Sequence, residues 1–220
     1  MVTLSEENYL KAIYHLGKRG SLAVSTNAIA DKVDAKASSV TDMLKKLSEK
    51  ELVNYIKYQG VNLTENGKKV AASVIRKHRL WEVFLVEKLN FSWDEVHEVA
   101  EQLEHIKSDK LVNQLDDLLG NPTHDPHGDP IPDKEGNIPK SQKILLSQIN
   151  QDVDCFCVGV KDSSATFLKY LDKNKIALGT PIHVMDKEPF DESMILKIND
   201  LELMISKEIA NNLYVKISQL

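Results

Sequence analysis

The sequence lacks several features, and each absence excludes a class of protein. Only two residues of 220 are cysteine, Cys155 and Cys157, and two thiols cannot complete a structural zinc tetrahedron or build a disulfide framework. The chain has no apolar run of roughly 18 residues, the length that spans a bilayer. Its first seven residues contain no basic segment followed by an apolar one, so a secretory signal is not expected. The sequence therefore predicts a soluble, cytoplasmic protein without a membrane partner.

The charge balance differs between the two ends of the chain. The formal net charge is −5, but residues 1–77 hold 13 Lys and Arg against 8 Asp and Glu, a balance of +5. Residues 78–220 have a balance of −10. A basic segment favours contact with a polyanion, and an acidic one favours contact with cations. With 42% hydrophobic residues, the chain is long enough for two or three small domains.

Hydrophobic periodicity near the N-terminus predicts a winged helix-turn-helix. Apolar side chains recur at helical spacing in three segments, residues 8–16, 25–33 and 36–50. The turn before the third segment is very short, which is typical of a helix-turn-helix. Two alternating segments follow, residues 52–58 and 61–63, with Gly60 between them. They are expected to form the β-hairpin wing.

The rest of the chain predicts a helical middle and a small β domain, so the fold class is mainly α with a small β part. Further helices are expected at residues 68–89, 97–105, 109–119 and 163–173. Residues 120–140 are rich in Pro, Gly and Asp and are expected to be a loop and linker. Short strands are expected at residues 154–160, 181–185, 194–198, 201–205 and 213–217. Their number and size favour an SH3-like β-barrel.

The segment from His97 to His105 carries the chemistry. His97, Glu101 and His105 are four residues apart, and Glu104 directly precedes His105. On one helix these side chains would form a single stripe of imidazoles and carboxylates. Like charges at this spacing repel, and a divalent cation relieves the repulsion. Nitrogen and oxygen ligands together suit manganese, ferrous iron or zinc, although a solvated helix face is the alternative for such a pattern.

Five segments together resemble a known family. They are Asn8–Tyr14, Arg76–Glu82, Val96–His105 with Ser108 and Asp109, Leu118–Pro122, and Pro126–Pro132. The chain resembles the diphtheria toxin repressor family of metal-dependent transcriptional repressors over its whole length, in particular the three-domain manganese-responsive members. The resemblance implies a winged-helix DNA-binding domain in residues 1–72, a helical dimerisation and metal-binding domain in 73–140, and an SH3-like (FeoA-like) domain in 141–220.

The resemblance also implies two metal sites. The primary site would use Asn8, Glu101, Glu104 and His105. The ancillary site would use His78, Glu82, His97, Asp125, His127 and Asp162. Iron-responsive members have Cys where this chain has Glu101, so the carboxylate favours Mn²⁺ as cofactor, with Fe²⁺ as the alternative. Lys11 replaces a carboxylate of the two-domain manganese members, so their binuclear centre is not expected.

The expected function is a homodimeric repressor of metal-homeostasis genes, in which the metal is the co-repressor that orders the dimer for operator binding. Phosphate contacts would come from Lys36, Lys45, Lys46 and Lys57. Base contacts would come from the start of the recognition helix, at Lys36, Ser38, Ser39, Thr41 and Asp42. No catalytic residue is assigned.

Two other functions stay open at the level of sequence. His97 to Glu101 is one residue short of the zincin pattern His-Glu-x-x-His, and a metal-dependent hydrolase would use such a stripe. Glu101 stands where that pattern needs its second histidine. A winged-helix adaptor, whose acidic body binds protein, is the other alternative. Metal-dependent DNA binding separates the repressor from both.

Overall fold

The computed structural model describes residues 2–20, 22–57, 59–139, 143–199 and 201–218. The chain forms two compact units. The first consists of residues 1–81, 100–121 and 131–138, and the second of residues 82–99, 122–130 and 139–220. The domain boundaries drawn from the sequence, at residues 72 and 140, stay a prediction. No described helix is long and apolar enough to cross a bilayer.

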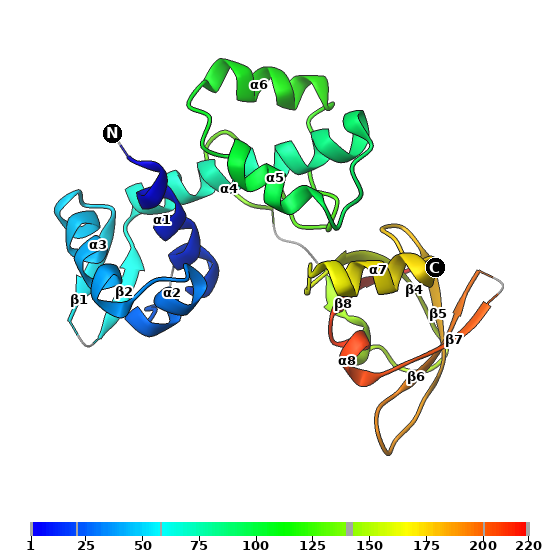
Figure 1. Ribbon diagram of the computed structural model, residues 1–220. Coiled ribbons are helices and arrows are strands. Elements are labelled where there is room, and N and C mark those ends of the chain that lie inside the picture. Colours follow the sequence, from blue (N-terminus) through cyan, green and yellow to red (C-terminus); the bar gives the residue numbers. More distant parts are fainter. Residues whose placement is uncertain (1, 21, 58, 140–142, 200, 219–220) are drawn as a thin grey trace. The chain divides into compact units, whose positions relative to one another are not determined.

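The first unit begins with the predicted winged helix-turn-helix. Its elements are α1 (Leu4–Leu16), α2 (Thr26–Lys32), α3 (Ala37–Glu49), β1 (Val53–Ile56) and β2 (Gly60–Leu63). Figure 1 shows the three blue helices gathered beside the β1–β2 hairpin. Their apolar faces share one core, in which Leu10, Ile13, Ile29, Leu44 and Leu47 have no exposed surface. The predicted helix-turn-helix and wing are confirmed.

Side-chain caps set where these helices begin. α1 starts at Leu4, earlier than predicted, because Thr3 and Glu6 form a capping box: Glu6 N donates to Thr3 Oγ1 at 3.4 Å, and Thr3 N donates to Glu6 Oε2 at 2.9 Å. Ser25 caps α2 as predicted, accepting from Ala28 N at 3.2 Å. Lys36 is the N-cap residue of α3, and its side chain makes no capping bond.

The helical middle differs from the prediction at one functionally important point. The helices are α4 (Glu65–Leu89), α5 (Val96–Leu103) and α6 (Asp109–Leu118). The expected helix through His105 is wrong at its end, since α5 stops at Leu103 and Glu104 and His105 lie in a turn. Ile106 N donates to Leu103 O at 3.2 Å, a tighter turn that ends the helical ladder. His97 and His105 therefore do not share one helical stripe.

The second unit contains the small β domain. Its strands are β3 (Ile144–Leu145), β4 (Val153–Val160), β5 (Pro181–Lys187), β6 (Met194–Ile198), β7 (Leu201–Ile205) and β8 (Leu213–Ile217). They pair antiparallel in the order β3-β8-β4-β5-β6-β7. β6, β7 and β8 have the predicted bounds, and the sheet confirms the SH3-like β domain.

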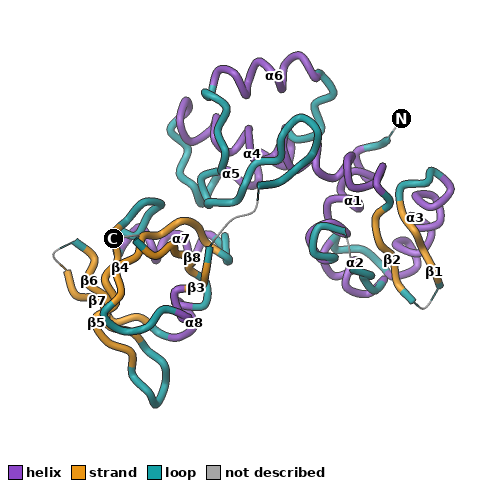
Figure 2. The backbone as a smooth tube through the Cα atoms, turned by 180° about the vertical axis from the view of Figure 1, so that it is seen from behind, coloured by secondary structure: helices purple, strands orange, loops and turns teal. Residues whose placement is uncertain are grey.

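Helices cover this sheet, and they complete its core. α7 (Ala165–Lys173) lies beside β4 and β8 in both Figure 1 and Figure 2, and its Leu168 and Leu171 belong to the buried core of the sheet. The short α8 (Lys207–Ala210) and the 3-10 turn η1 (Leu146–Gln148) were not predicted. Cys155 and Cys157 are buried in the same core, and burial raises the pKa of the Cys155 thiol to about 12. Such thiols are unreactive core side chains.

Candidate metal centres and DNA-facing helix

The side chains predicted to contact DNA lie on the outer face of α3 and on the wing. Val40, Leu44 and Leu47 form the buried face of the helix. The predicted contact residues are exposed apart from half-buried Thr41, and they are Lys36, Ser38, Ser39, Thr41, Asp42, Lys45, Lys46 and Lys57. Three of them already have partners on α3: Thr41 Oγ1 donates to Ala37 O at 2.9 Å, and Lys45 Nζ lies 3.2 Å from Asp42 Oδ1.

Glu6 ties α1 to the end of α3. Its carboxylate is fully buried and accepts from Lys50 Nζ at 2.8 Å, while Lys46 Nζ lies 3.1 Å away. Burial opposes ionisation, but the bonds from Lys50, the Thr3 backbone and Lys46 outweigh it and lower the pKa of Glu6 to about 2. The position of α1 is thus linked electrostatically to α3.

A buried carboxylate, Glu104, forms the centre of a cluster in the first unit. Its side chain is 1% exposed, and its Oε2 lies 2.6 Å from both His78 Nδ1 and Lys11 Nζ. Since a carboxylate oxygen only accepts, both groups donate to it. Burial opposes ionisation of Glu104, yet the bond from His78 and the charge of Lys11 lower its pKa. His78, predicted for the ancillary site, therefore contacts a predicted primary ligand.

The neighbouring histidine, His105, contacts α1 through a residue that the sequence analysis missed. His105 Nδ1 donates to Glu7 Oε2 at 2.6 Å, and His105 Nε2 lies 3.6 Å from Glu104 Oε1. Glu7 is buried, whereas Asn8, the predicted ligand on α1, is exposed. The role of Asn8 as a metal ligand stays a prediction.

The helical periodicity of α1 contains a signal for Glu7. Glu7 lies three residues before Leu10 and seven before Tyr14, and both of these side chains face the core. Glu7 is therefore on the same buried face of α1. The signal was lost because the helix was expected to start only at residue 8.

A second cluster lies in the second unit. Glu82, Asp125 and His127 are all buried, and one ligand atom from each lies within 4.8 Å of the others. His127 Nδ1 is 3.7 Å from Glu82 Oε1, and the half-exposed His97 reaches the same oxygen at 3.5 Å. The structure thus brings together four of the predicted ancillary residues.

His127 is held in one orientation by the protein. Its Nε2 lies 2.8 Å from the carbonyl oxygen of Trp93, so Nε2 carries the hydrogen and Nδ1 faces the carboxylates. Burial alone would lower the pKa of His127, but the bond and charge of Glu82, with the charge of Asp125 and the Trp93 carbonyl, raise it to about 9. Metal-binding histidines typically use one ring nitrogen for the ion and donate a hydrogen bond from the other to a carbonyl oxygen, as Nε2 of His127 does here.

The loop that carries Asp125 and His127 is fixed by its own hydrogen bonds and by β4. Asp125 Oδ1 accepts from His127 N and Asp129 N, each at 2.9 Å. Val160 N donates to His127 O at 2.9 Å, and Gly128 has φ +82° against the Val158 carbonyl. Asp162 instead accepts from Ser164 N at 2.8 Å and belongs to no group of three candidate ligands among the described residues.

The sequence is similar to known repressor families along most of its length. Residues 1–61 match the family described as "Iron dependent repressor, N-terminal DNA binding domain", and residues 64–133 match "Iron dependent repressor, metal binding and dimerisation domain". Residues 144–217 match the FeoA domain. A solved manganese-dependent transcriptional repressor in complex with manganese is 31% identical, with a TM-score of 0.86 over 97% of this chain and 100% of that one.

The chain belongs to the diphtheria toxin repressor family.

Two curated relatives illustrate the range of the family. The HTH-type transcriptional regulator MntR of Oceanobacillus iheyensis is 36% identical over 120 residues, which are 54% of this chain and 80% of that protein. The iron-dependent repressor IdeR of Mycobacterium tuberculosis is 35% identical over 126 residues, 57% of this chain and 54% of that protein. The chain thus spans about half the length of the IdeR relatives that it matches.

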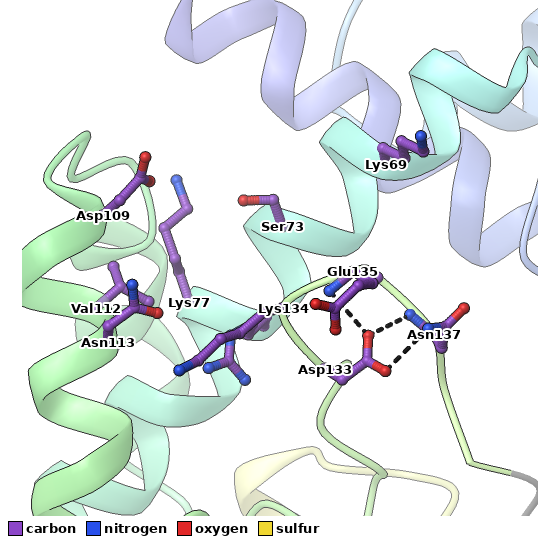
Figure 3. Close-up of a pocket in the computed structure, with 12 residues that line it drawn as sticks. Lys69, Ser73, Lys77, Asp109, Val112, Asn113, Asp133, Lys134, Glu135 and Asn137 are labelled. Atoms are coloured by element: carbon purple, nitrogen blue, oxygen red, sulfur yellow. Dashed lines mark hydrogen bonds between the residues drawn. The ribbon is translucent and has the colours of Figure 1, made fainter.

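This family member also has a cavity of about 740 Å³ in its first unit, beside α4 and α6. Figure 3 shows Asp133 there, accepting from Asn137 N at 2.7 Å and Asn137 Nδ2 at 2.9 Å. Lys77 faces the cavity, whereas His78, the next residue of α4, contacts Glu104. The described lining contains none of the candidate metal ligands.

Proposed function

We propose that the protein is a metal-dependent transcriptional repressor that binds operator DNA as a homodimer and controls metal-homeostasis genes. The observation that carries the proposal is the double role of α1. Glu6 contacts Lys46 and Lys50 at the end of α3, and Glu7, the next residue, contacts His105. An ion that changes the contacts of His105 and Glu104 therefore acts on the element that holds the recognition helix.

The donor atoms of both clusters fit a divalent transition metal. In the first unit the candidates are Glu101, Glu104 and His105, with Glu7 or Asn8 from α1. In the second they are Glu82, His97, Asp125 and His127. Buried carboxylate oxygens and imidazole nitrogens suit Mn²⁺, Fe²⁺ and Zn²⁺. A bound ion would supply the positive charge that balances the buried carboxylates. Without it, Lys11, His127 and backbone N–H groups balance them.

Manganese is the proposed co-repressor, with ferrous iron as the alternative. Glu101 offers a hard carboxylate oxygen and not a thiolate, which favours a hard ion. The similar solved structures include manganese-dependent transcriptional repressors. Intrinsic affinity at a given site rises from Mn²⁺ to Fe²⁺, so metal availability in the cell also contributes to the choice.

DNA recognition is proposed to rest on α3 and the wing. Lys36, Lys45 and Lys57 are exposed and would neutralise phosphates, while Lys46 would divide its charge between Glu6 and DNA. Ser38, Ser39 and Asp42 would read base edges in the major groove. The Thr41 hydroxyl already donates to Ala37 O, so it would contribute as an acceptor or through its methyl group.

The family assignment supports this function over a metal-dependent hydrolase. Duplexes selected from a random pool in Mn²⁺ would provide a ligand, and fluorescence anisotropy would compare their affinity in Mn²⁺, in Fe²⁺ without oxygen, and in EDTA. Coupling energies of this kind correspond to roughly 5–150-fold, and we expect Mn²⁺ to tighten binding at the upper end of this range. Equal affinity in Mn²⁺, in Fe²⁺ and in EDTA would contradict the proposal.

A further inference from the structure

One residue among the candidate ligands of the first unit is a cation. Lys11 projects from α1 with its side chain only 14% exposed, and its Nζ lies 2.6 Å from Glu104 Oε2 and 3.7 Å from Glu101 Oε1. The same ammonium lies 3.3 Å from His78 Nδ1. It is thus close to two carboxylates that the proposed function assigns to the metal.

The ammonium of Lys11 compensates the buried negative charge of Glu104. Glu104 is almost fully buried, and a carboxylate in such a place needs a compensating positive charge or several hydrogen bonds. Lys11 provides the charge, and His78 provides a second donor to the same oxygen. Glu101, Glu104 and His105 do not form a three-ligand group within 4.8 Å among the described residues, and Lys11 lies between two of them.

We infer that Lys11 is an internal counter-cation that competes with the metal for Glu104 and Glu101 and so sets the metal concentration at which the protein responds. The inference rests on the proposed function, because it needs metal binding at these carboxylates. A divalent ion on Glu104 must displace the ammonium from Oε2 or share the carboxylate with a like charge a few ångströms away. Either event weakens metal binding, because like charges at this separation repel strongly where water is excluded.

The ammonium also has a structural consequence. Lys11 belongs to α1, Glu104 follows α5, and 93 residues separate them in the sequence. The ion pair therefore holds α1 against the turn after α5 without any metal. Removal of the charge on Lys11 should have two opposite effects: tighter binding of metal, and lower stability of the metal-free protein.

The test compares Lys11→Gln with Lys11→Arg and Lys68→Gln. The glutamine amide still donates to Glu104 but carries no charge, whereas arginine keeps the charge. Lys68→Gln is the matched control, because it removes one positive charge from an i, i+3 pair with exposed Glu65 at 2.8 Å. Full-length proteins would be titrated with Mn²⁺ by calorimetry after chelator treatment, and melting temperatures would be measured in EDTA.

We expect Lys11→Gln to bind Mn²⁺ about tenfold more tightly than the wild type and to melt at a lower temperature in EDTA. Lys11→Arg and Lys68→Gln should bind Mn²⁺ within about twofold of the wild type. If the wild type binds Mn²⁺ and Lys11→Gln does not bind it more tightly than Lys68→Gln, the inference is wrong and the proposed function stands. If the wild type binds neither Mn²⁺ nor, in a titration without oxygen, Fe²⁺, both are overturned.

Discussion

The two carboxylate–histidine clusters balance buried negative charge in different ways. In the first unit, Glu104 takes its positive charge from Lys11, which lies 93 residues away in the sequence. In the second, Glu82 and Asp125 are balanced by His127 and by backbone N–H groups of the same short loop. The first cluster therefore depends on where α1 lies, and the second depends on a loop fixed to β4.

This difference bears on their roles. A cluster whose charge comes from α1 is suited to a switch, because any ion that competes with Lys11 changes the attachment of the helix that also contacts α3 through Glu6. A cluster whose loop members are fixed by hydrogen bonds within that loop and to β4 is suited to constant occupancy and to holding the loop in place. The following predictions test whether the first cluster is the switch and the second cluster holds its loop in place.

The largest effect is expected at Glu104. Glu104→Gln keeps the shape of the side chain but removes the charge that Lys11 and a metal would share. Mn²⁺ should then no longer tighten operator binding, a loss of up to about 100-fold, and the metal-free protein should lose up to about 3 kcal/mol of stability. Anisotropy titrations with and without Mn²⁺ measure the first effect, and urea denaturation measures the second.

Glu98→Gln is the matched control, since Glu98 is an exposed carboxylate on the neighbouring α5. It should leave both quantities near their wild-type values. Full Mn²⁺ stimulation in Glu104→Gln would show that the cluster in the first unit is not the switch, and the cluster of Glu82, Asp125 and His127 would then be the candidate.

A smaller effect is expected at Gly128, which holds the second cluster to β4. Its φ of +82° is unfavourable for alanine, and a Cβ there would overlap the carbonyl oxygen of Val158. Gly128→Ala should cost about 2 kcal/mol of unfolding free energy and weaken metal binding to Glu82 and His127. Urea denaturation and calorimetric stoichiometry measure the two effects.

Gly179→Ala separates the backbone strain from the overlap. Gly179 has nearly the same φ, +83°, but no described heavy atom lies within 4 Å of a Cβ placed there. It should cost only about 1 kcal/mol. Equal losses in the two variants would mean that the contact between Gly128 and β4 contributes nothing to the loop.

The smallest effect is expected at Glu6, which links α1 to α3. Its pKa is about 2 in the folded protein against an ordinary 4.5. A lowered pKa stabilises the fold above pH 4.5, and this contribution is lost as the pH falls towards 2. Because Lys46 and Lys50 are partly exposed, Glu6→Gln should cost only about 1 kcal/mol at pH 7.

Urea denaturation from pH 7 to pH 2 checks this, since the stability difference between Glu6→Gln and the wild type should shrink below pH 4.5. Glu65→Gln, which removes an exposed carboxylate paired with Lys68, should stay close to the wild type throughout. A difference between Glu6→Gln and the wild type that persists at pH 2 would mean that the carboxylate charge is not its cause.

Local pattern was enough to predict most of the elements. The hydrophobic periodicity of α1 to α3, the cap at Ser25 and the alternation in β6, β7 and β8 depend on side chains near one another in the sequence. The kinds of residue that bind metal were also recognisable, because His and Glu offer the nitrogen and oxygen ligands that divalent transition metals accept. The sequence by itself thus determined the winged helix, the β domain and, through the family resemblance, the candidate ligands other than Glu7.

Only the tertiary structure decided how those ligands are grouped. The end of α5 at Leu103 separates His105 from the helical face of His97, and the earlier start of α1 brings Glu7 to His105. Lys11 meets Glu104, and Gly128 meets Val158, across long stretches of chain. Such contacts depend on the rotation of one helix against another and on one turn of backbone, which no local pattern specifies. Burial then decides which cation balances each carboxylate, because a buried charge must find its partner among the groups that the fold brings within a few ångströms.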